Sequence, residues 1–230
     1  MAYALAWAGA DVILWARDAV ALKRQAARLH GLGRRALAHT VNITNPAAVR
    51  RAVSRALAQF GRIDILLNNA GIWRGDEAAA LSRRDWQDVV ETNFTALFFV
   101  SQAVVPAMTR RGYGKIINVS STSGVLALPQ GAVYGSTKAA LTHLTKILAV
   151  EWGPRGVRVN GIAPGLFRTD MTRDVFADRA WIAKRRARIP LRRFGEPPDL
   201  TGLAVFLASS ASDHITGQTI IIDGGASLAL

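Results

Sequence analysis

The sequence predicts a doubly wound α/β fold, in which helices cover both faces of a parallel sheet. Short apolar runs of strand length alternate with helical stretches along the chain, and this alternation is typical of right-handed β–α–β crossovers. The strand runs are almost entirely apolar, as parallel strands buried on both faces must be. The 230 residues contain no obvious linker, so we expect one domain over 1–230.

Each element has its own local signal, taken in order from the amino terminus. The run DVILWA has strand length, and Leu22, Ala26 and Leu29 follow it at helical spacing. Asn45 as N-cap, Pro46 in the first turn and Gly61 at the end delimit the next helix. We expect helices over 1–8, 18–29, 46–60, 83–111, 133–152 and 199–208. We expect strands over 11–16, 36–41, 63–67, 115–120, 157–162 and 219–223.

Composition excludes several classes of site. The chain has no cysteine, which excludes disulfides, thiolate zinc sites and a cysteine nucleophile. This fits a reducing compartment, and we expect a cytoplasmic protein. Its four histidines are scattered, so we expect no metal site. Residues 1–16 lack a basic leading segment and contain Asp11, so we expect neither a signal sequence nor a membrane anchor.

The net charge of +13 is the most unusual bulk property. Such a charge can indicate nucleic acid, a membrane surface or an acidic partner. The arginines are spread along the chain, without one basic helix or interleaved aromatic residues. We therefore expect a soluble enzyme of arginine-rich composition that binds no nucleic acid.

Arg17 directly follows the first strand, at the end of the sheet where doubly wound folds bind ligands. An acidic residue there would accept from the ribose 2′-hydroxyl of NAD(H), whereas an arginine pairs with the 2′-phosphate of NADP(H). Arg17, with Arg34 and Arg35 possibly nearby, favours NADP(H) over NAD(H). A solvated surface arginine is the open alternative.

A second group of polar residues follows the strand over 115–120. Ser121 lies just past this strand, and Tyr134 and Lys138 share one face at the start of the next helix. A tyrosine has a pKa near ~10, and a neighbouring ammonium group stabilises the phenolate and lowers that pKa. The helix N-terminus acts in the same direction. This pattern favours acid–base chemistry on a carbonyl or alcohol oxygen.

Six segments resemble the short-chain dehydrogenase/reductase family in their order and spacing. They are NNAG at 68–71, Asn93 within VVETNFTALF, SSTSG at 120–124, YGSTK at 134–138, NGIAPGLFRT at 160–169 and TGQTIIIDGG at 216–225. The resemblance implies a catalytic set. Tyr134 would be the general acid or base, Ser121 would polarise the substrate carbonyl, and Lys138 would lower the tyrosine pKa and hold the nicotinamide ribose. Asn93 would hold a water in a proton relay.

The resemblance also implies cofactor contacts along the same edge. Asn42, which stands where many relatives have aspartate, and Ile43 would flank the adenine. The adenosine ribose would be lined by Asn69, Ala70 and Gly71. The nicotinamide carboxamide would be held by Pro164, Gly165, Phe167 and Thr169.

The amino terminus departs from the family pattern. The family begins with an apolar strand and a TGxxxGxG turn, and residues 1–8 here match the helix that follows them. We therefore expect this strand and turn to be absent, the neighbouring strands to lack a ladder partner, and the pyrophosphate to lose its backbone donors. A start site assigned too late, and a fragment or assembly subunit with impaired cofactor binding, are both open.

Substrate and assembly follow from the resemblance alone. The segments LTKILAVEWGPRGVRVNGIAPGLFRT and PLRRFGEP resemble the gluconate 5-dehydrogenase-like branch most, and the 3-oxoacyl-acyl-carrier-protein reductases next. This implies a small sugar acid, polyol or ketone, or alternatively a 3-oxoacyl thioester. Residues 170–194, at the position of the family's substrate lid, are strongly cationic, and a cationic lid would favour an anionic substrate or an acidic carrier protein. A solvated face of an amphipathic helix is the equally open alternative. Family members are usually oligomers, so we expect a homodimer or homotetramer.

Overall fold

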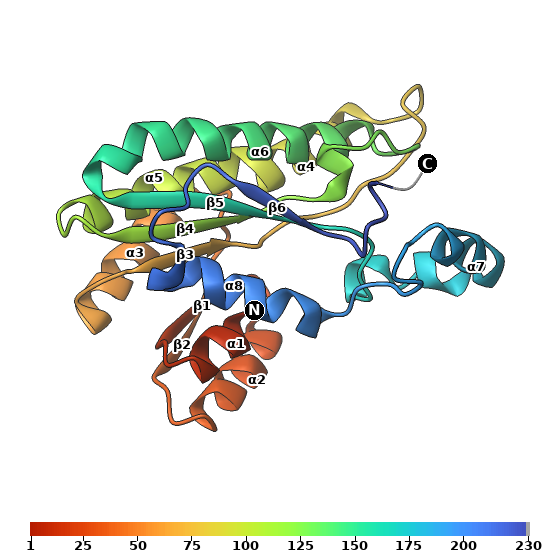
Figure 1. The fold of residues 1–230 in the computed structure, drawn as a ribbon. Coiled ribbons are helices and arrows are strands. Elements are labelled where there is room, and N and C mark those ends of the chain that lie inside the picture. Colours follow the sequence, from red (N-terminus) through yellow and green to blue (C-terminus); the bar gives the residue numbers. More distant parts are fainter. Residues whose placement is uncertain (229–230) are drawn as a thin grey trace.

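The computed structural model describes residues 1–228, which form parallel sheets flanked by helices (Figure 1). The helices are α1 (Ala2–Trp7), α2 (Ala19–His30), α3 (Pro46–Phe60), α4 (Arg83–Val90), α5 (Ala96–Thr109), α6 (Ala132–Trp152), α7 (Arg179–Ala187) and α8 (Thr201–Ala208). The strands are β1 (Val12–Ala16), β2 (Ala36–Thr40), β3 (Ile65–Asn68), β4 (Gly114–Val119), β5 (Val157–Pro164) and β6 (Thr219–Ile222). The predicted Rossmann-like α/β class is confirmed.

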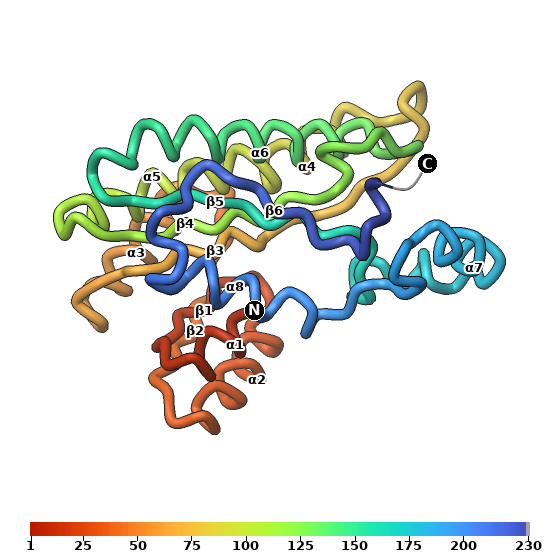
Figure 2. The backbone as a smooth tube through the Cα atoms, in the orientation of Figure 1, coloured from red at the N-terminus to blue at the C-terminus, as the bar shows by residue number. Residues whose placement is uncertain are grey.

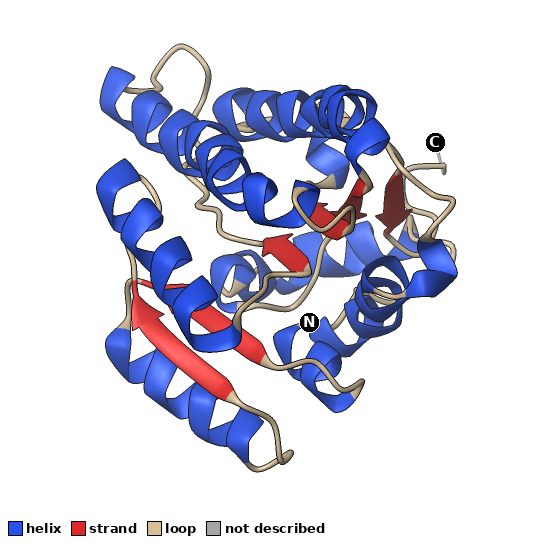
Figure 3. Ribbon diagram, turned by 90° about the vertical axis from the view of Figure 1, so that its left-hand side faces the viewer, coloured by secondary structure: helices blue, strands red, loops and turns tan. Residues whose placement is uncertain are grey.

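The strands form two parallel sheets. One sheet pairs β1 with β2, and the other has the order β3-β4-β5-β6. Figure 3 shows the two-stranded sheet set apart from the other strands. Among the described residues β1 and β3 share no ladder. As a result, four of the five β1 residues and three of the four β3 residues are only half-buried, whereas β4 is buried over its first five residues.

Side-chain caps fix the starts of α2 and α3, and the cap at Asn45 is the predicted one. The Asp18 side chain accepts from the backbone N–H of Ala21 at 2.9 Å, and the Asn45 side chain accepts from that of Ala48 at 3.0 Å. Gly61 ends α3 with a φ of 72°, a conformation that favours glycine. These local interactions explain why α2 and α3 begin within a residue of the predicted positions.

Two cores sandwich the four-stranded sheet. On one face α3, α5 and α6 pack on β4 and β5 through residues such as Val53, Met108 and Leu148. On the other face α8 packs Ala204 and Leu207 on Ile117 and Ile162. A third, smaller cluster joins α1 and α2 to β1 and β2. The tube in Figure 2 follows this path, with the amino-terminal unit lying beside α8.

The predicted helix over 83–111 is a continuous rod with a defect in its middle. Between α4 and α5 the backbone makes a π-helical turn over Glu91–Thr95, which spacing of apolar residues does not reveal. By length and composition this rod could cross a membrane. Here it packs against the sheet and α6, and eight residues of α5 are buried, so it is a core helix.

Candidate active site

Tyr134 and Lys138 lie one turn apart near the start of α6, beside the turn that follows β4. The ammonium nitrogen of Lys138 is 5.6 Å from the centroid of the Tyr134 ring. Ser121 is the first residue of that turn and is 8% exposed. The structure therefore brings the three residues that the motif predicted into one cluster at the carboxyl end of β4.

Two glycines allow the serine turn to approach α6 this closely. A Cβ atom on Gly124 would lie 2.7 Å from the backbone carbon of Lys138, and one on Gly135 would lie 2.8 Å from the carbonyl oxygen of Ser123. Any larger residue at either position would force the turn away from the helix. The glycines of SSTSG and YGSTK thus hold Ser121 next to Tyr134.

Burial controls the titration of both groups. It raises the pKa of the Tyr134 phenol, and the Ser121 hydroxyl beside it acts in the opposite direction. Burial also lowers the pKa of Lys138 to about 8. The sequence predicted that Lys138 would lower the pKa of Tyr134, but in the structure this pKa is raised, because burial of the phenol outweighs the hydrogen bond with Ser121. Tyr134 is therefore held protonated at neutral pH, the form of a proton donor.

Asn93 reaches this cluster because of the π-helical turn. Its side chain is fully buried, accepts from the Ile72 N–H at 2.8 Å and donates to the Ile72 carbonyl at 2.9 Å. These bonds clamp the loop after β3 to the long helix. Each polar atom of the Asn93 amide makes one of these bonds, so the side chain acts here as a clamp on the loop. The water relay that the resemblance implied stays a prediction.

A buried polar network lies beneath the site and was missed by the sequence reasoning. Asn68 donates to Ser101 and to Asn118, both at 2.9 Å, and Asn118 donates to Thr145 at 2.9 Å. All four side chains are at most 4% exposed. The network ties the carboxyl ends of β3 and β4 to α5 and α6. The signal in the sequence was an asparagine near the end of each of two neighbouring apolar strands.

The loop after β3 and the lysine leave room and donors for a ribose. A Cβ atom on Gly71 would lie 3.4 Å from the side-chain oxygen of Asn93 and 3.6 Å from the ammonium nitrogen of Lys138. Within the described residues Lys138 donates only to the Val119 carbonyl, at 2.8 Å, and an ammonium group has three donors. Asn69 and Ala70, next to Gly71, are exposed. These residues fit a nucleotide cofactor.

The predicted nicotinamide contacts follow the end of β5. A Cβ atom on Gly165 would lie 2.6 Å from the side chain of Asp223, so only glycine allows this approach to the end of β6. Phe167 is buried, with its ring against Gly195, and Thr169 caps the turn that starts the lid. Pro164 ends the strand itself. The Phe167 ring is therefore part of the core, leaving its backbone for any cofactor contact.

At the other sheet the structure separates the predicted cationic residues. Arg17 is exposed just beyond the carboxyl end of β1. Arg35 is bound to Asp11 at 2.7 Å, at the opposite end of the same parallel ladder, and a five-residue strand separates the ends by about 13 Å. The expectation that Arg34 and Arg35 lie near Arg17 is wrong, because both precede the amino end of β2.

Asn42 and Ile43 follow β2. The Asn42 side-chain oxygen accepts from the N–H and the hydroxyl of Thr44, at 3.2 and 3.0 Å. This oxygen is therefore occupied within its own loop, and the bond to an adenine amino group that we expected from it would require Thr44 to give way. Ile43 packs against the main core.

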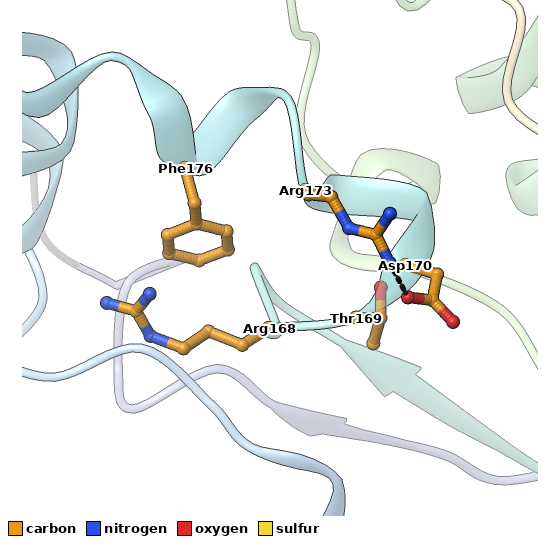
Figure 4. A pocket seen from close by; sticks show the side chains of 5 residues that line it. All are labelled: Arg168, Thr169, Asp170, Arg173 and Phe176. Atoms are coloured by element: carbon orange, nitrogen blue, oxygen red, sulfur yellow. Dashed lines mark hydrogen bonds and ion pairs between the residues drawn. The ribbon is translucent and has the colours of Figure 1, made fainter.

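The cationic segment projects from the carboxyl edge of the sheet as α7 and the turns before it (Figure 1). None of the residues of α7 is buried. An open hollow of about 440 Å³ lies among the turns that precede α7 (Figure 4). Beside it the Arg168 guanidinium lies 4.3 Å from the centroid of the Phe176 ring, and Arg173 pairs with Asp170. The lining contains neither Tyr134 nor Ser121, so this hollow belongs to the lid.

Comparisons with known proteins agree with this geometry. A family profile described as "Enoyl-(Acyl carrier protein) reductase" matches residues 1–227. The chain is 41% identical to a gluconate 5-dehydrogenase of Gluconobacter oxydans, over 100% of this chain and 90% of that one. It is 37% identical to a 3-oxoacyl-[acyl-carrier-protein] reductase of Synechocystis, over 97% and 90%. The crystal structure of a gluconate 5-dehydrogenase from Burkholderia cenocepacia, in complex with NADP and tartrate, superposes with a TM-score of 0.96 at 39% identity, over 100% and 90%. The chain belongs to the short-chain dehydrogenase/reductase family of oxidoreductases.

Proposed function

We propose that this protein uses NADP(H) to interconvert a ketone and a secondary alcohol on a small sugar acid. The observation that carries the proposal is the convergence of Ser121, Tyr134 and Lys138 beside Gly71. A purely structural subunit would not require a buried tyrosine and lysine held together in this way. Their presence favours an enzyme over the non-catalytic alternative.

The residues divide the work of reduction between them. When bound, the cofactor supplies a hydride to the carbonyl carbon. The Tyr134 hydroxyl gives its proton to the carbonyl oxygen, so that ketone, NADPH and one proton become alcohol and NADP⁺. The Ser121 hydroxyl donates to the same oxygen as negative charge develops on it. Lys138 holds the ribose hydroxyls with its remaining donors, and oxidation runs the same steps in reverse.

The preference for NADP(H) rests on Arg17. It is exposed beyond the end of β1, and no carboxylate lies within 4 Å of it among the described residues. A guanidinium group in this place pairs with a 2′-phosphate. The related gluconate 5-dehydrogenase structure was obtained with NADP.

The sugar-acid assignment rests on the relatives and on the charge of the lid. A gluconate 5-dehydrogenase is 41% identical to the chain, and the related crystal structure holds tartrate, a hydroxylated dicarboxylate. The lid segment over 170–194 carries an excess of arginine and lysine, which attracts an anionic substrate.

A substrate panel tests the proposal. Purified protein is assayed with NADPH and with NADH against 5-keto-D-gluconate and neutral ketones of similar size, and in reverse with D-gluconate. We expect turnover of the keto acid with NADPH in excess of every neutral ketone. Preference for neutral or bulky ketones, or for NADH, would contradict the substrate or the cofactor part of the proposal.

A second candidate is reduction of a 3-oxoacyl group on an acidic carrier protein. Its support is the solvent-exposed helix α7, with Lys184, Arg185 and Arg186 in its last turn, together with the similarity to an acyl-carrier-protein reductase. The measurement is the KM for a 3-oxoacyl carrier protein against salt. A KM that rises steeply between 50 and 300 mM NaCl, with turnover above that of the sugar acid, would favour this candidate.

We propose further that the protein is a cytoplasmic homodimer or homotetramer. The long helices present exposed apolar side chains, with Phe99 on α5 at 43% and Val150 on α6 at 77% exposure. Two copies of this face would cover each other around a twofold axis. Light scattering should give a multiple of the 24.7 kDa chain mass, and Val150→Asp should lower it to that of the monomer.

A further inference from the structure

The indole of Trp73 packs directly on the proton-donating residue of the site. The ring centroids of Trp73 and Tyr134 are 4.9 Å apart, with their planes at 65°, an edge-to-face arrangement. Trp73 is 36% exposed, so part of the ring remains open to a ligand. None of the family motifs in the sequence includes this residue.

The backbone holds the indole from both sides. The residue before it, Ile72, is fixed to the long helix by the two hydrogen bonds with Asn93. Two residues later, a Cβ atom on Gly75 would lie 2.5–2.7 Å from three atoms of the indole ring. Only glycine at position 75 leaves the ring in this place. The contact with Tyr134 is therefore built into the loop and does not depend on the rotamer of Trp73 alone.

The position of the ring determines what can reach the phenol. The substrate oxygen must lie within hydrogen-bonding distance of Tyr134 and Ser121, so the groups on the carbonyl carbon extend past the indole. An indole ring at this place would leave room for a narrow, extended chain and would collide with a fused or branched ring. Its apolar surface also gives the C–H groups of a short polyol a contact beside the reacting carbon.

We propose that Trp73 is a specificity-determining residue, whose indole, seated by Gly75, admits short polyhydroxy acids to Tyr134 and excludes bulky ketones. This inference rests on the proposed function, because it takes the Tyr134 hydroxyl as the proton donor to a small keto acid. The charged lid acts on the carboxylate end of the substrate, and Trp73 acts at the reacting end.

The test compares two substrates in matched variants. The ratio of kcat/KM for 5-keto-D-gluconate to that for 2-tetralone, a bicyclic ketone, is measured with NADPH for the wild type, Trp73→Ala and Gly75→Ala. Trp86→Ala on α4, where the indole is 45% exposed, is the control for loss of an indole. Gly202→Ala on α8, where a Cβ atom meets nothing within 4 Å, is the control for the added methyl group.

We expect Trp73→Ala to lower the ratio about 100-fold, by loss of the small substrate and gain of the bulky one. Gly75→Ala should shift the ratio in the same direction, and the two controls should leave it unchanged. Circular dichroism checks that each variant folds, and Trp73→Phe replaces Trp73→Ala if the latter does not. An unchanged ratio in folded Trp73 and Gly75 variants, or equal losses for both substrates, would overturn the role of Trp73 while leaving the proposed function intact. A wild type that ignores the keto acid would overturn both.

Discussion

The two sheets of this protein differ in how completely their strands are paired and buried. Strand β4 has partners on both sides, β3 and β5, and its first five residues are buried. Within residues 1–228 strand β1 pairs only with β2, and four of its five residues are half-buried. The four-stranded sheet lies beside Tyr134, Ser121 and their supporting network. The two-stranded sheet is followed by Arg17. The groups proposed for chemistry therefore lie beside the more completely buried sheet, and the group proposed for the cofactor phosphate lies beside the less buried one.

The largest expected effect comes from removing the proton donor beside the four-stranded sheet. Tyr134→Phe should lower kcat about 1,000-fold, since the phenol hydroxyl supplies the general acid. The Kd for NADPH and the melting temperature should change little, because the ring and its contact with Trp73 remain. A Tyr134→Phe protein that keeps more than a tenth of its turnover would refute the assignment.

Next in size is the loss of the network beneath the site. Asn118→Ala leaves the side chains of Asn68 and Thr145 without their shared partner, and we expect the free energy of unfolding to fall by about 2–3 kcal/mol. Urea denaturation measures it. Asn69→Ala, at an exposed position one residue past β3, should cost less than about 0.5 kcal/mol. Equal losses in the two variants would show that the buried network does not contribute more to the free energy of unfolding than an exposed side chain does.

The buried lysine gives a pH-dependent effect of somewhat smaller size. Its pKa is about 8 in the folded protein against an ordinary value of 10.5, so between these values the unfolded chain binds more protons. Stability from this group must therefore rise with pH from about 8 toward 10. In Lys138→Met that rise should be smaller by about 2 kcal/mol. Chemical denaturation at pH 7.5 and pH 10 compares the two proteins, and an identical rise in both would contradict the burial of a charged lysine.

The smallest expected effect concerns the two-stranded sheet of β1 and β2. Arg17→Ala should raise the Kd for NADPH about tenfold, through loss of one charge-assisted contact, and leave the Kd for NADH unchanged. Titration of cofactor fluorescence measures both constants. The control is Arg34→Ala, at the amino end of the same ladder. An equal effect of the two substitutions would show that general positive charge, and no specific pairing, favours the phosphorylated cofactor.

The sequence was most informative where short-range interactions decide the structure. The cap at Asn45, the apolar strand runs and the spacing from Tyr134 to Lys138 act within a few residues, and each prediction from them is confirmed. It failed where partners come from distant segments. The pairing of Arg35 with Asp11 and the contact of the Trp73 indole with Tyr134 depend on tertiary packing. The change in the pKa of Tyr134 depends in the same way on burial, which spacing cannot supply. The bond from Thr44 to the Asn42 oxygen, two residues away, is a local interaction that was also missed.

The π-helical turn at Glu91–Thr95 has a mechanical consequence. Because it holds one residue more than an α-helical turn would, α4 and α5 are rotated relative to each other by about 100° compared with a regular helix. Deleting a single residue within this turn would rewind the rod into one uniform phase and swing the amide of Asn93 away from Ile72. The two hydrogen bonds that hold the loop after β3 to the long helix would then be lost. The indole of Trp73 would move away from Tyr134 with that loop, although no residue touching a substrate had been altered.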